Sequence, residues 1–128
     1  MFFTKGLERF NVPSMYMSDA SQGVNIRKEL DDQLEKSVAF PCSIALASTW
    51  NKELTVTYAK SIGEECRAGE IAVLLGPGIN IYRVSQNGRN FEYLGEDPYL
   101  ISRIVENYIV GTVSYTHLTL PTNREVYE

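Results

Sequence analysis

Asp19 has the residue type and the position of a group that binds hydroxyls. It follows an apolar run that predicts a strand, and α/β folds place their sites at the carboxyl ends of parallel strands. A carboxylate there can accept two hydrogen bonds from adjacent sugar hydroxyls. The alternative is an Asx-turn residue that caps its own loop, and position alone favours neither.

Arg89 lies between Gly88 and Asn90 in a loop that follows a second apolar run. Its guanidinium offers five N–H donors in a fixed fork, which suits vicinal hydroxyls or a carboxylate. Glu92 lies close enough in sequence to orient Arg89 by ion pairing. The alternative is an arginine that ties one loop to another, and for Glu92 this structural role is the favoured one.

Aromatic side chains surround the same loop, namely Tyr82, Phe91, Tyr93 and Tyr99. Exposed aromatic faces can contact the apolar side of a sugar ring, although aromatics near a loop are more often simply packed. The preceding turn, Gly76-Pro77-Gly78, lacks the spacing of a phosphate loop, and Pro77 removes one amide donor. We therefore do not expect nucleotide binding at this turn.

Two pairs of neighbouring carboxylates, Glu64-Glu65 and Glu96-Asp97, resemble the paired acids of glycoside hydrolysis only in composition. Neighbouring residues on a helix point in different directions, and Asp97 has the position of a helix cap. Both pairs are expected to be solvated.

The two cysteines, Cys42 and Cys66, lie in apolar surroundings without CxxC spacing or ligand-spaced histidines. This pattern favours two free buried thiols over a disulfide or a metal pair. No metal site is expected.

The elements that position these residues alternate. Residues 12–17 predict a strand after a helix-like start, and Asn51 predicts the N-cap of a helix that runs to about Ala68 and stops at Gly69. The apolar stripe of this helix is Leu54, Tyr58, Ile62 and Cys66. Residues 71–75 form a continuous apolar run, typical of a central parallel strand covered on both faces.

A second helix is predicted to begin at Asp97 and Pro98 and to end near Gly111. Its broad apolar stripe consists of Leu100, Ile101, Ile104, Val105, Tyr108 and Ile109. The alternation of strand and helix indicates an α/β fold with a mostly parallel sheet, either a barrel or a doubly wound sheet. The 128 residues are too few for a complete α/β barrel, which needs roughly 250.

The composition, 44% hydrophobic and 22% charged, is that of an ordinary globular domain. With 12 basic against 16 acidic residues and no basic block, the chain is not expected to bind nucleic acid. No apolar stretch is long enough to span a membrane, and the charged first ten residues do not form a signal peptide. The oligomeric state is left open.

Residues 113–128 depart from the preceding pattern. The segment VSYTHLTLPT resembles the conceptual translation of a transposase adapter used in sequencing libraries. We therefore expect residues 113–128 to be a non-native tail, although a genuine strand is permitted on propensity alone. His117, the single histidine, lies in this tail and is not expected to act as a base or a metal ligand.

Four motifs together resemble the N-terminal catalytic domain of glycoside hydrolase family 3. They are MYMSDASQGV, AFPCSIALASTWNKEL, AKSIGEECRAGEIAVLLGPGINIYR and GRNFEYLGEDPYL. They occur in family order with family spacing, and the resemblance covers residues 3–111. It implies that residues 1–112 are the early βα units of a (β/α)8 TIM barrel, in a chain that lacks the beginning and most of the end of its parent.

The resemblance also implies roles for individual residues. Asp19 matches the aspartate that binds the nonreducing sugar in subsite −1, and Arg89 matches the arginine of that subsite. The family's Lys-His pair, its nucleophile and its acid/base are expected outside this chain, so no catalytic residue is assigned. Many members read SDGPxGxR, whereas this chain has Asn25 at the arginine position. Arg27 is the candidate substitute, with Glu92 as a possible supporting residue.

The parent is thus expected to be a retaining β-glucosidase that hydrolyses terminal nonreducing β-D-glucosyl residues without metal or organic cofactor. Its substrate would be a β-linked oligosaccharide or an aryl or alkyl β-glucoside, and the chain alone is expected to be inactive. The alternatives are a β-xylosidase of the same family, a non-catalytic carbohydrate-binding relative, and a doubly wound nucleotide-binding domain without its glycine fingerprint. The location of the bacterial parent, cytoplasmic or periplasmic, is left open.

Overall fold

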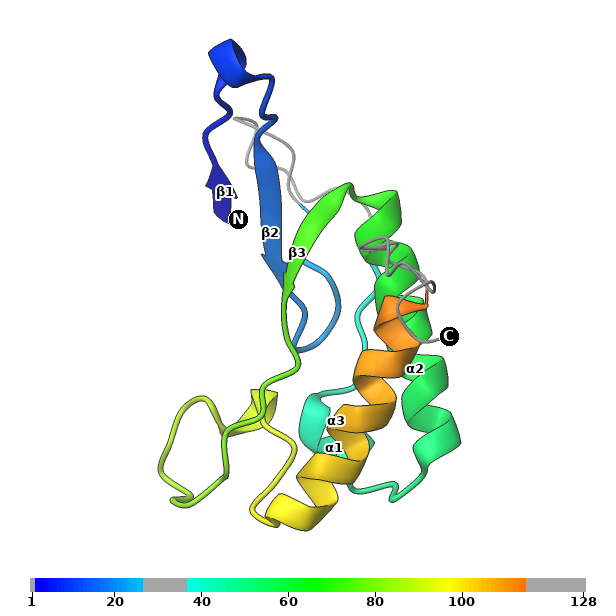
Figure 1. Ribbon diagram of the computed structural model, residues 1–128. Helices are drawn as coiled ribbons and strands as arrows, with labels where there is room; N and C mark the ends of the chain where they lie inside the picture. The colour runs from blue at the N-terminus through cyan, green and yellow to red at the C-terminus, as the bar shows by residue number, and fades with distance from the viewer. Residues whose placement is uncertain (1, 27–36, 115–128) are drawn as a thin grey trace, which may run out of the picture.

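The computed structural model describes residues 2–26 and 37–114. In chain order its strands and helices are β1 (Phe2–Thr4), β2 (Met15–Asp19), α1 (Ser43–Ala47), α2 (Lys52–Ala68), β3 (Ile71–Leu75) and α3 (Pro98–Val113). Two short 3-10 helices, η1 (Glu8–Phe10) and η2 (Asn90–Glu92), lie in the connections. From β2 onward strands and long helices alternate as predicted, except that the short helix α1, which was not predicted, precedes α2. Figure 1 shows both long helices running antiparallel to β2 and β3.

The sheet has the order β1-β2-β3, with β1 antiparallel and β3 parallel to β2. The sheet is therefore mixed in the described residues, and the predicted helix-like start is wrong, because a strand and a 3-10 turn stand there. The strand predicted at 12–17 begins later, at Met15. Val12 instead forms an isolated antiparallel bridge with Leu7, which closes the turn between β1 and β2.

The boundaries predicted for β3 are confirmed, but its burial is not. Within the described residues β3 pairs only with β2, and the side chains of Val73 and Leu75 are 39% and 45% exposed. An apolar run without alternation is typical of a strand covered on both faces. Here the strand lies at an edge of the described sheet.

Helix α2 begins and ends as predicted. The side chain of Asn51 accepts a hydrogen bond from the amide of Leu54 at 3.0 Å. The predicted stripe is wrong at Leu54, which is 45% exposed. The buried face consists of Thr55, Ala59, Ile62, Gly63 and Cys66.

Gly69 caps the end of α2 with an ordinary φ of −88°, while Glu70 takes the left-handed φ of 56°. A Cβ at Gly69 would lie 2.8 Å from side-chain atoms of Ile26. Close packing against Ile26, and not the backbone conformation of Gly69, therefore disfavours a larger residue at this position.

Helix α3 also begins as predicted, because the Asp97 carboxylate accepts from the amide of Tyr99 at 2.9 Å and Pro98 occupies the first turn. Its predicted stripe is wrong at Ile109, which is 50% exposed. The helix continues past Gly111 to Val113, the first residue of the expected tail.

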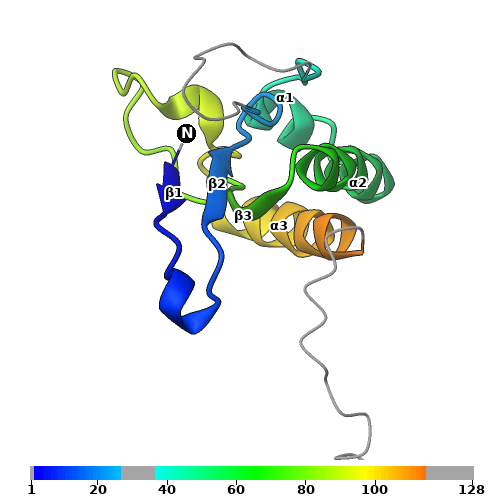
Figure 2. The same ribbon diagram turned by 90° about the horizontal axis from the view of Figure 1, so that it is seen from above.

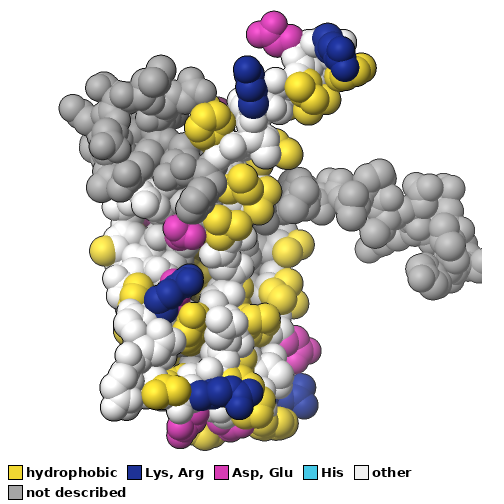
Figure 3. All heavy atoms as spheres, turned by 90° about the vertical axis from the view of Figure 1, so that its left-hand side faces the viewer, with side chains coloured by type: hydrophobic (Ala, Val, Ile, Leu, Met, Phe, Trp, Pro, Cys, Tyr) yellow, Lys and Arg dark blue, Asp and Glu magenta, His cyan; other side chains and the backbone are white. Residues whose placement is uncertain are grey.

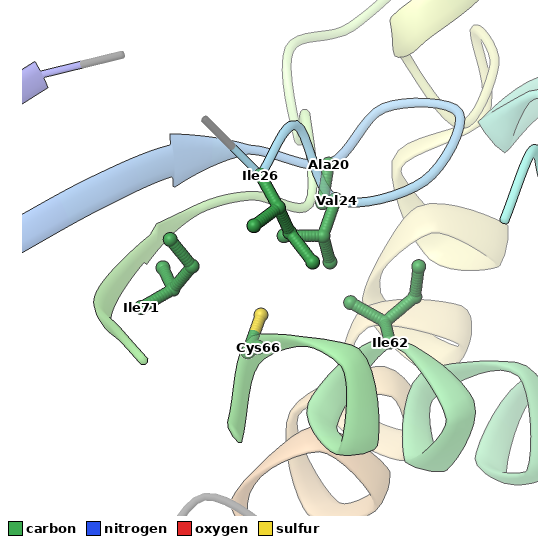
Figure 4. Packing of buried hydrophobic residues seen from close by; sticks show 6 residues of the cluster. All are labelled: Ala20, Val24, Ile26, Ile62, Cys66 and Ile71. Atoms are coloured by element: carbon green, nitrogen blue, oxygen red, sulfur yellow. The ribbon is translucent and has the colours of Figure 1, made fainter. Parts of the chain in front are cut away.

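Helices α2 and α3 lie side by side against one side of the sheet (Figure 2). One buried cluster joins the residues after β2 to α2 and β3, and consists of Ala20, Val24, Ile26, Ile62, Cys66 and Ile71 (Figure 4). Two more clusters lie between the helices and around Leu94. The packing thus fixes the carboxyl ends of β2 and β3 relative to the start of α3.

No helix in residues 2–26 and 37–114 is long and apolar enough to cross a membrane. The hairpin turn between β1 and β2 protrudes from the body and carries charged side chains beside hydrophobic ones (Figure 3). Leu7 and Phe10 are more than half exposed in this turn.

Candidate functional site

Asp19 is the last residue of β2 and stands opposite Leu75, the last residue of β3, in the parallel register. Both strands therefore end at the same edge, from which the loop of residues 76–97 departs (Figure 1). Figure 3 shows acidic, basic and hydrophobic side chains gathered at this end of the molecule. Parallel α/β folds build their sites at this edge.

Main-chain groups and the Ser18 hydroxyl close the described part of the loop after β2. The amide of Asn25 donates to the Asp19 carbonyl at 3.2 Å, and the buried Ser18 hydroxyl donates to the Asn25 carbonyl at 2.8 Å. Gly23 has φ of 112°, and a Cβ there would lie 2.2 Å from the Val38 carbonyl oxygen. The turn is therefore held by backbone groups and one hydroxyl, while the side chain of Asp19 is exposed.

Arg89 and Glu92 form the ion pair considered from the sequence: the Nε of Arg89 donates to the Oε1 of Glu92. The Arg89 side chain is 73% exposed and that of Glu92 is 19% exposed. The hydrogen bond that Arg89 donates to Glu92, and then the charge of Glu92, raise the pKa of Arg89.

The loop that carries Arg89 is anchored at both ends. Gly78 forms a parallel bridge with Tyr93, and a Cβ at Gly78 would lie 2.4 Å from the Glu92 carbonyl oxygen. The amide of Tyr82 donates to the Gly95 carbonyl at 2.9 Å. The buried Leu94 then packs against α1 and α3, where its neighbours are Ala47, Ile101 and Ile104.

Asn90 is a residue of this loop that the sequence reasoning missed. Its Nδ2 donates to the carbonyl oxygens of Val84 and Ser85 at 2.8 and 3.4 Å. Its Oδ1 is buried without a hydrogen-bond partner. No sequence spacing marks these contacts, because they arise where the loop folds back on itself.

The aromatic residues do not form one platform. Tyr93 is 7% exposed and belongs to the packed interior, while Phe91 and Tyr99 are 45% and 67% exposed. The guanidinium of Arg103 lies 5.3 Å from the centre of the Tyr99 ring. Phe91, two residues after Arg89, is therefore an exposed aromatic side chain in the same loop.

One member of each carboxylate pair has a structural role. The Oε1 of Glu65 accepts from the amide of Val38 at 2.9 Å and its Oε2 is buried, so the expectation that Glu65 is solvated is wrong. Glu64 and Glu96 are exposed, and Asp97 caps α3. Glu65 is covered by a segment that is distant in sequence, around Val38. The pattern of residues along the helix could not predict this contact.

Cys42 and Cys66 are both free thiols, as predicted, but only Cys66 is buried, so the expected burial of Cys42 is wrong. Burial, and then the charge of Glu65, raise the pKa of Cys66 to about 11, so its thiol is neutral near pH 7. In the described residues no group of three or more His, Cys, Asp or Glu side chains could hold a metal ion. Arg27 and His117 lie outside the described residues.

The model for the Glycosyl hydrolase family 3 N terminal domain matches residues 3–119. Beta-glucosidase BoGH3A of Bacteroides ovatus is 45% identical over 116 residues, which are 86% of this chain and 16% of that protein. Thermostable beta-glucosidase B of Acetivibrio thermocellus is 42% identical over 118 residues, which are 87% of this chain and 15% of that protein.

Among solved structures, beta-glucosidase 3B of Thermotoga neapolitana in complex with glucose superposes with a TM-score of 0.78 at 38% identity. The match covers 88% of this chain and 16% of that one, so the chain spans a small part of its relatives. Its α/β fold is that of the early βα units of their (β/α)8 barrel. The family match, the sequence relatives and the superposition agree, and the chain belongs to the N-terminal domain of glycosyl hydrolase family 3.

Proposed function

We propose that the protein containing this chain is a retaining β-glucosidase and that this segment supplies Asp19 and Arg89 to the subsite of the nonreducing sugar. The observation that carries the proposal is that Asp19 ends β2 opposite the end of β3, at the edge from which the loop that carries Arg89 departs. Relatives named as beta-glucosidases support the substrate class.

The two side chains are chemically complementary to a sugar. The exposed Asp19 carboxylate can accept from two adjacent hydroxyls. Because the contact with Glu92 uses the Nε of Arg89, the terminal nitrogens keep four of the five N–H donors for a ligand. Glu92 would thus orient the guanidinium without occupying its outer edge. Arg27, outside the described residues, remains a candidate for an additional contact.

The proposed role of this segment is binding and not bond cleavage. A retaining glycosidase needs two carboxyl groups about 5–5.5 Å apart across the scissile bond. In the described part of the chain, Glu92 pairs with Arg89, Asp97 caps α3 and Glu65 binds the backbone of Val38. We therefore propose that the rest of the parent supplies the nucleophile and acid/base, and that the 128-residue chain alone is inactive. No metal or organic cofactor is required by this chemistry.

Residues 113–128 are proposed to be a non-native tail, so that the native domain segment is 1–112. The resemblance of VSYTHLTLPT to an adapter translation supports this, while the family match runs on to residue 119. Resequencing the source gene past the codon for Gly111 tests the proposal. A native sequence that departs from this chain near residue 113 is expected, and an identical one would refute it.

A β-xylosidase activity is the second candidate. A GH3 exo-beta-xylosidase (XlnD) superposes with a TM-score of 0.73 at 26% identity, covering 85% of this chain and 15% of that one. Glucose and xylose share their ring hydroxyls and differ at the hydroxymethyl group, so contacts of Asp19 and Arg89 to ring hydroxyls would be common to both substrates.

A chimera tests the proposed function. Residues 3–112 replace the matched segment of the Bacteroides ovatus relative, and hydrolysis of p-nitrophenyl β-D-glucoside and β-D-xyloside is measured. We expect the glucoside to be preferred. A preference for the xyloside would favour the second candidate, and a folded chimera that neither binds gluco-configured inhibitors nor hydrolyses either substrate would refute the proposed binding role of this segment.

A further inference from the structure

The Asn90 side chain holds the loop in which Arg89 stands. Its Nδ2 reaches back to the carbonyl oxygens of Val84 and Ser85, while its own amide donates to the Asn87 carbonyl at 3.2 Å. These contacts surround the backbone of Arg89, whose amide donates to the Asn87 side chain at 3.2 Å. Asn90 thus connects the part of the loop around Arg89 to the earlier part at Val84 and Ser85.

The orientation of this carboxamide is costly to maintain. The Oδ1 of Asn90 is buried and has no hydrogen-bond partner, and an orphaned acceptor loses its hydration without compensation. Such an arrangement persists where another contact of the same group holds it in place. The donor bonds of Nδ2 to Val84 and Ser85 are the contacts that do so.

The Asn90 side chain is coupled to Arg89 through the single turn of η2. Asn90 is the first residue of η2, Arg89 is its N-cap, and Glu92 is its last residue. The amide of Glu92 donates to the Arg89 carbonyl at 3.2 Å, so the ion pair spans a turn whose start is fixed by Asn90. Release of the Asn90 side chain would loosen both backbone and ion pair.

We propose that Asn90 is a positioning residue, whose carboxamide fixes the turn on which the guanidinium of Arg89 faces Glu92. That this orientation serves sugar recognition rests on the proposed function. The positioning of Arg89 by Asn90 is a property of the sugar-free chain. An experiment can therefore refute the positioning or the proposed function independently.

The test is nuclear magnetic resonance of the full 128-residue chain at slightly acidic pH. The Nε–H signal of Arg89, assigned by its loss in Arg89→Lys, is followed for position and hydrogen exchange. Asn90→Ala removes the carboxamide, and Asn90→Leu removes its polarity while keeping its volume. Glu92→Gln provides the reference signal for a guanidinium whose carboxylate partner has been neutralised.

Both Asn90 variants are expected to exchange the Arg89 Nε–H about tenfold faster, with the signal displaced toward that of Glu92→Gln. The matched control is Asn107→Ala. On α3 the carboxamide of Asn107 donates a comparable hydrogen bond to the Arg103 carbonyl at 2.7 Å, and its removal should leave the Arg89 signal unchanged.

Three results would overturn the proposal. The first is a wild-type Arg89 signal in both Asn90 variants. The second is a wild-type signal in Asn90→Leu alone, since volume would then suffice. The third is loss of the dispersed α2 and α3 amide signals in both variants, because Asn90 would then hold the whole domain and not the Arg89 turn. Failure of sugar hydrolysis in the chimera, with the expected Arg89 shifts, would refute only the function.

Discussion

The Nε of Arg89 donates to the Oε1 of Glu92 across the single turn of η2, and this pair is the most direct electrostatic contact at the candidate site. The acceptor is largely covered and the donor is largely exposed. The pair therefore fixes one end of the guanidinium and leaves the other end toward solvent, which suits an arginine that binds a ligand.

Glu92→Gln is expected to weaken substrate binding with little effect on stability. Because the arginine end of the pair is largely exposed, the pair is expected to contribute little to folding, whereas a misdirected guanidinium loses its contacts to the sugar. In the chimera we expect KM for the β-glucoside to rise about three- to tenfold, by the strength of one ordinary hydrogen bond. Steady-state kinetics and urea unfolding measure the two effects.

The matched control for this variant is Glu106→Gln on α3. Glu106 pairs with Arg103 at the same sequence spacing and at 3.4 Å. The KM of the Glu106→Gln chimera should equal that of the unmodified chimera. If Glu106→Gln raised KM as much as Glu92→Gln, the effect would be one of surface charge and not of Arg89 orientation.

Asp19→Asn is expected to lower kcat/KM for the β-glucoside by at least about 100-fold. The carboxylate is proposed to accept from two hydroxyls, and each hydrogen bond to a charged group contributes about 1.5–3 kcal/mol. The substitution keeps the size of the side chain and leaves the loop bonds to the Asp19 carbonyl in place. Unchanged kcat/KM in a folded chimera would remove Asp19 from the site.

Helix ends and their order were predictable because their signals are local. Asn51 and Asp97 each satisfy amide donors within three residues, so the residue types alone indicate where α2 and α3 begin. The βαβ order then placed Asp19 and Arg89 at one edge of the sheet.

Features that depend on distant partners were not predictable. The start of β2 is set by pairing with Phe2–Thr4, and a short apolar run does not specify a partner. Asn90 acts through Val84 and Ser85, which reach it only after the loop has folded. The cover of Glu65 likewise depends on the remote Val38.

Gly111→Ala is expected to destabilise the packing of α3 on α2 by about 1–3 kcal/mol. A Cβ at Gly111 would lie 2.7 Å from both the Val56 carbonyl oxygen and the Ala59 Cβ. The backbones must therefore separate. Gly88→Ala is the control, because a Cβ there meets no atom within 4 Å. Urea unfolding followed by circular dichroism compares the two, and equal midpoints would contradict the close approach.

The free energy of unfolding is expected to fall as the pH rises from about 9 to 11, because of the titration of Cys66. Burial raises its pKa from 9.0 in the unfolded chain to about 11, so the folded state keeps a proton that the unfolded state has lost. Its contribution is complete below pH 9 and is lost as the pH rises through about 11, by at most about 3 kcal/mol.

Cys66→Ala should flatten the fall in unfolding free energy over this interval, even though it lowers the stability at neutral pH by opening a cavity. Cys42→Ala is the control: Cys42 is only half-buried and lies outside the Cys66 cluster, so this variant should keep the wild-type slope. Burial and then the charge of Cys42 raise the pKa of Tyr58 to about 12, which adds a loss of the same sign at higher pH. Urea titrations at several pH values therefore compare the slopes between about pH 9 and pH 10, below the range in which unfolded tyrosines lose their protons.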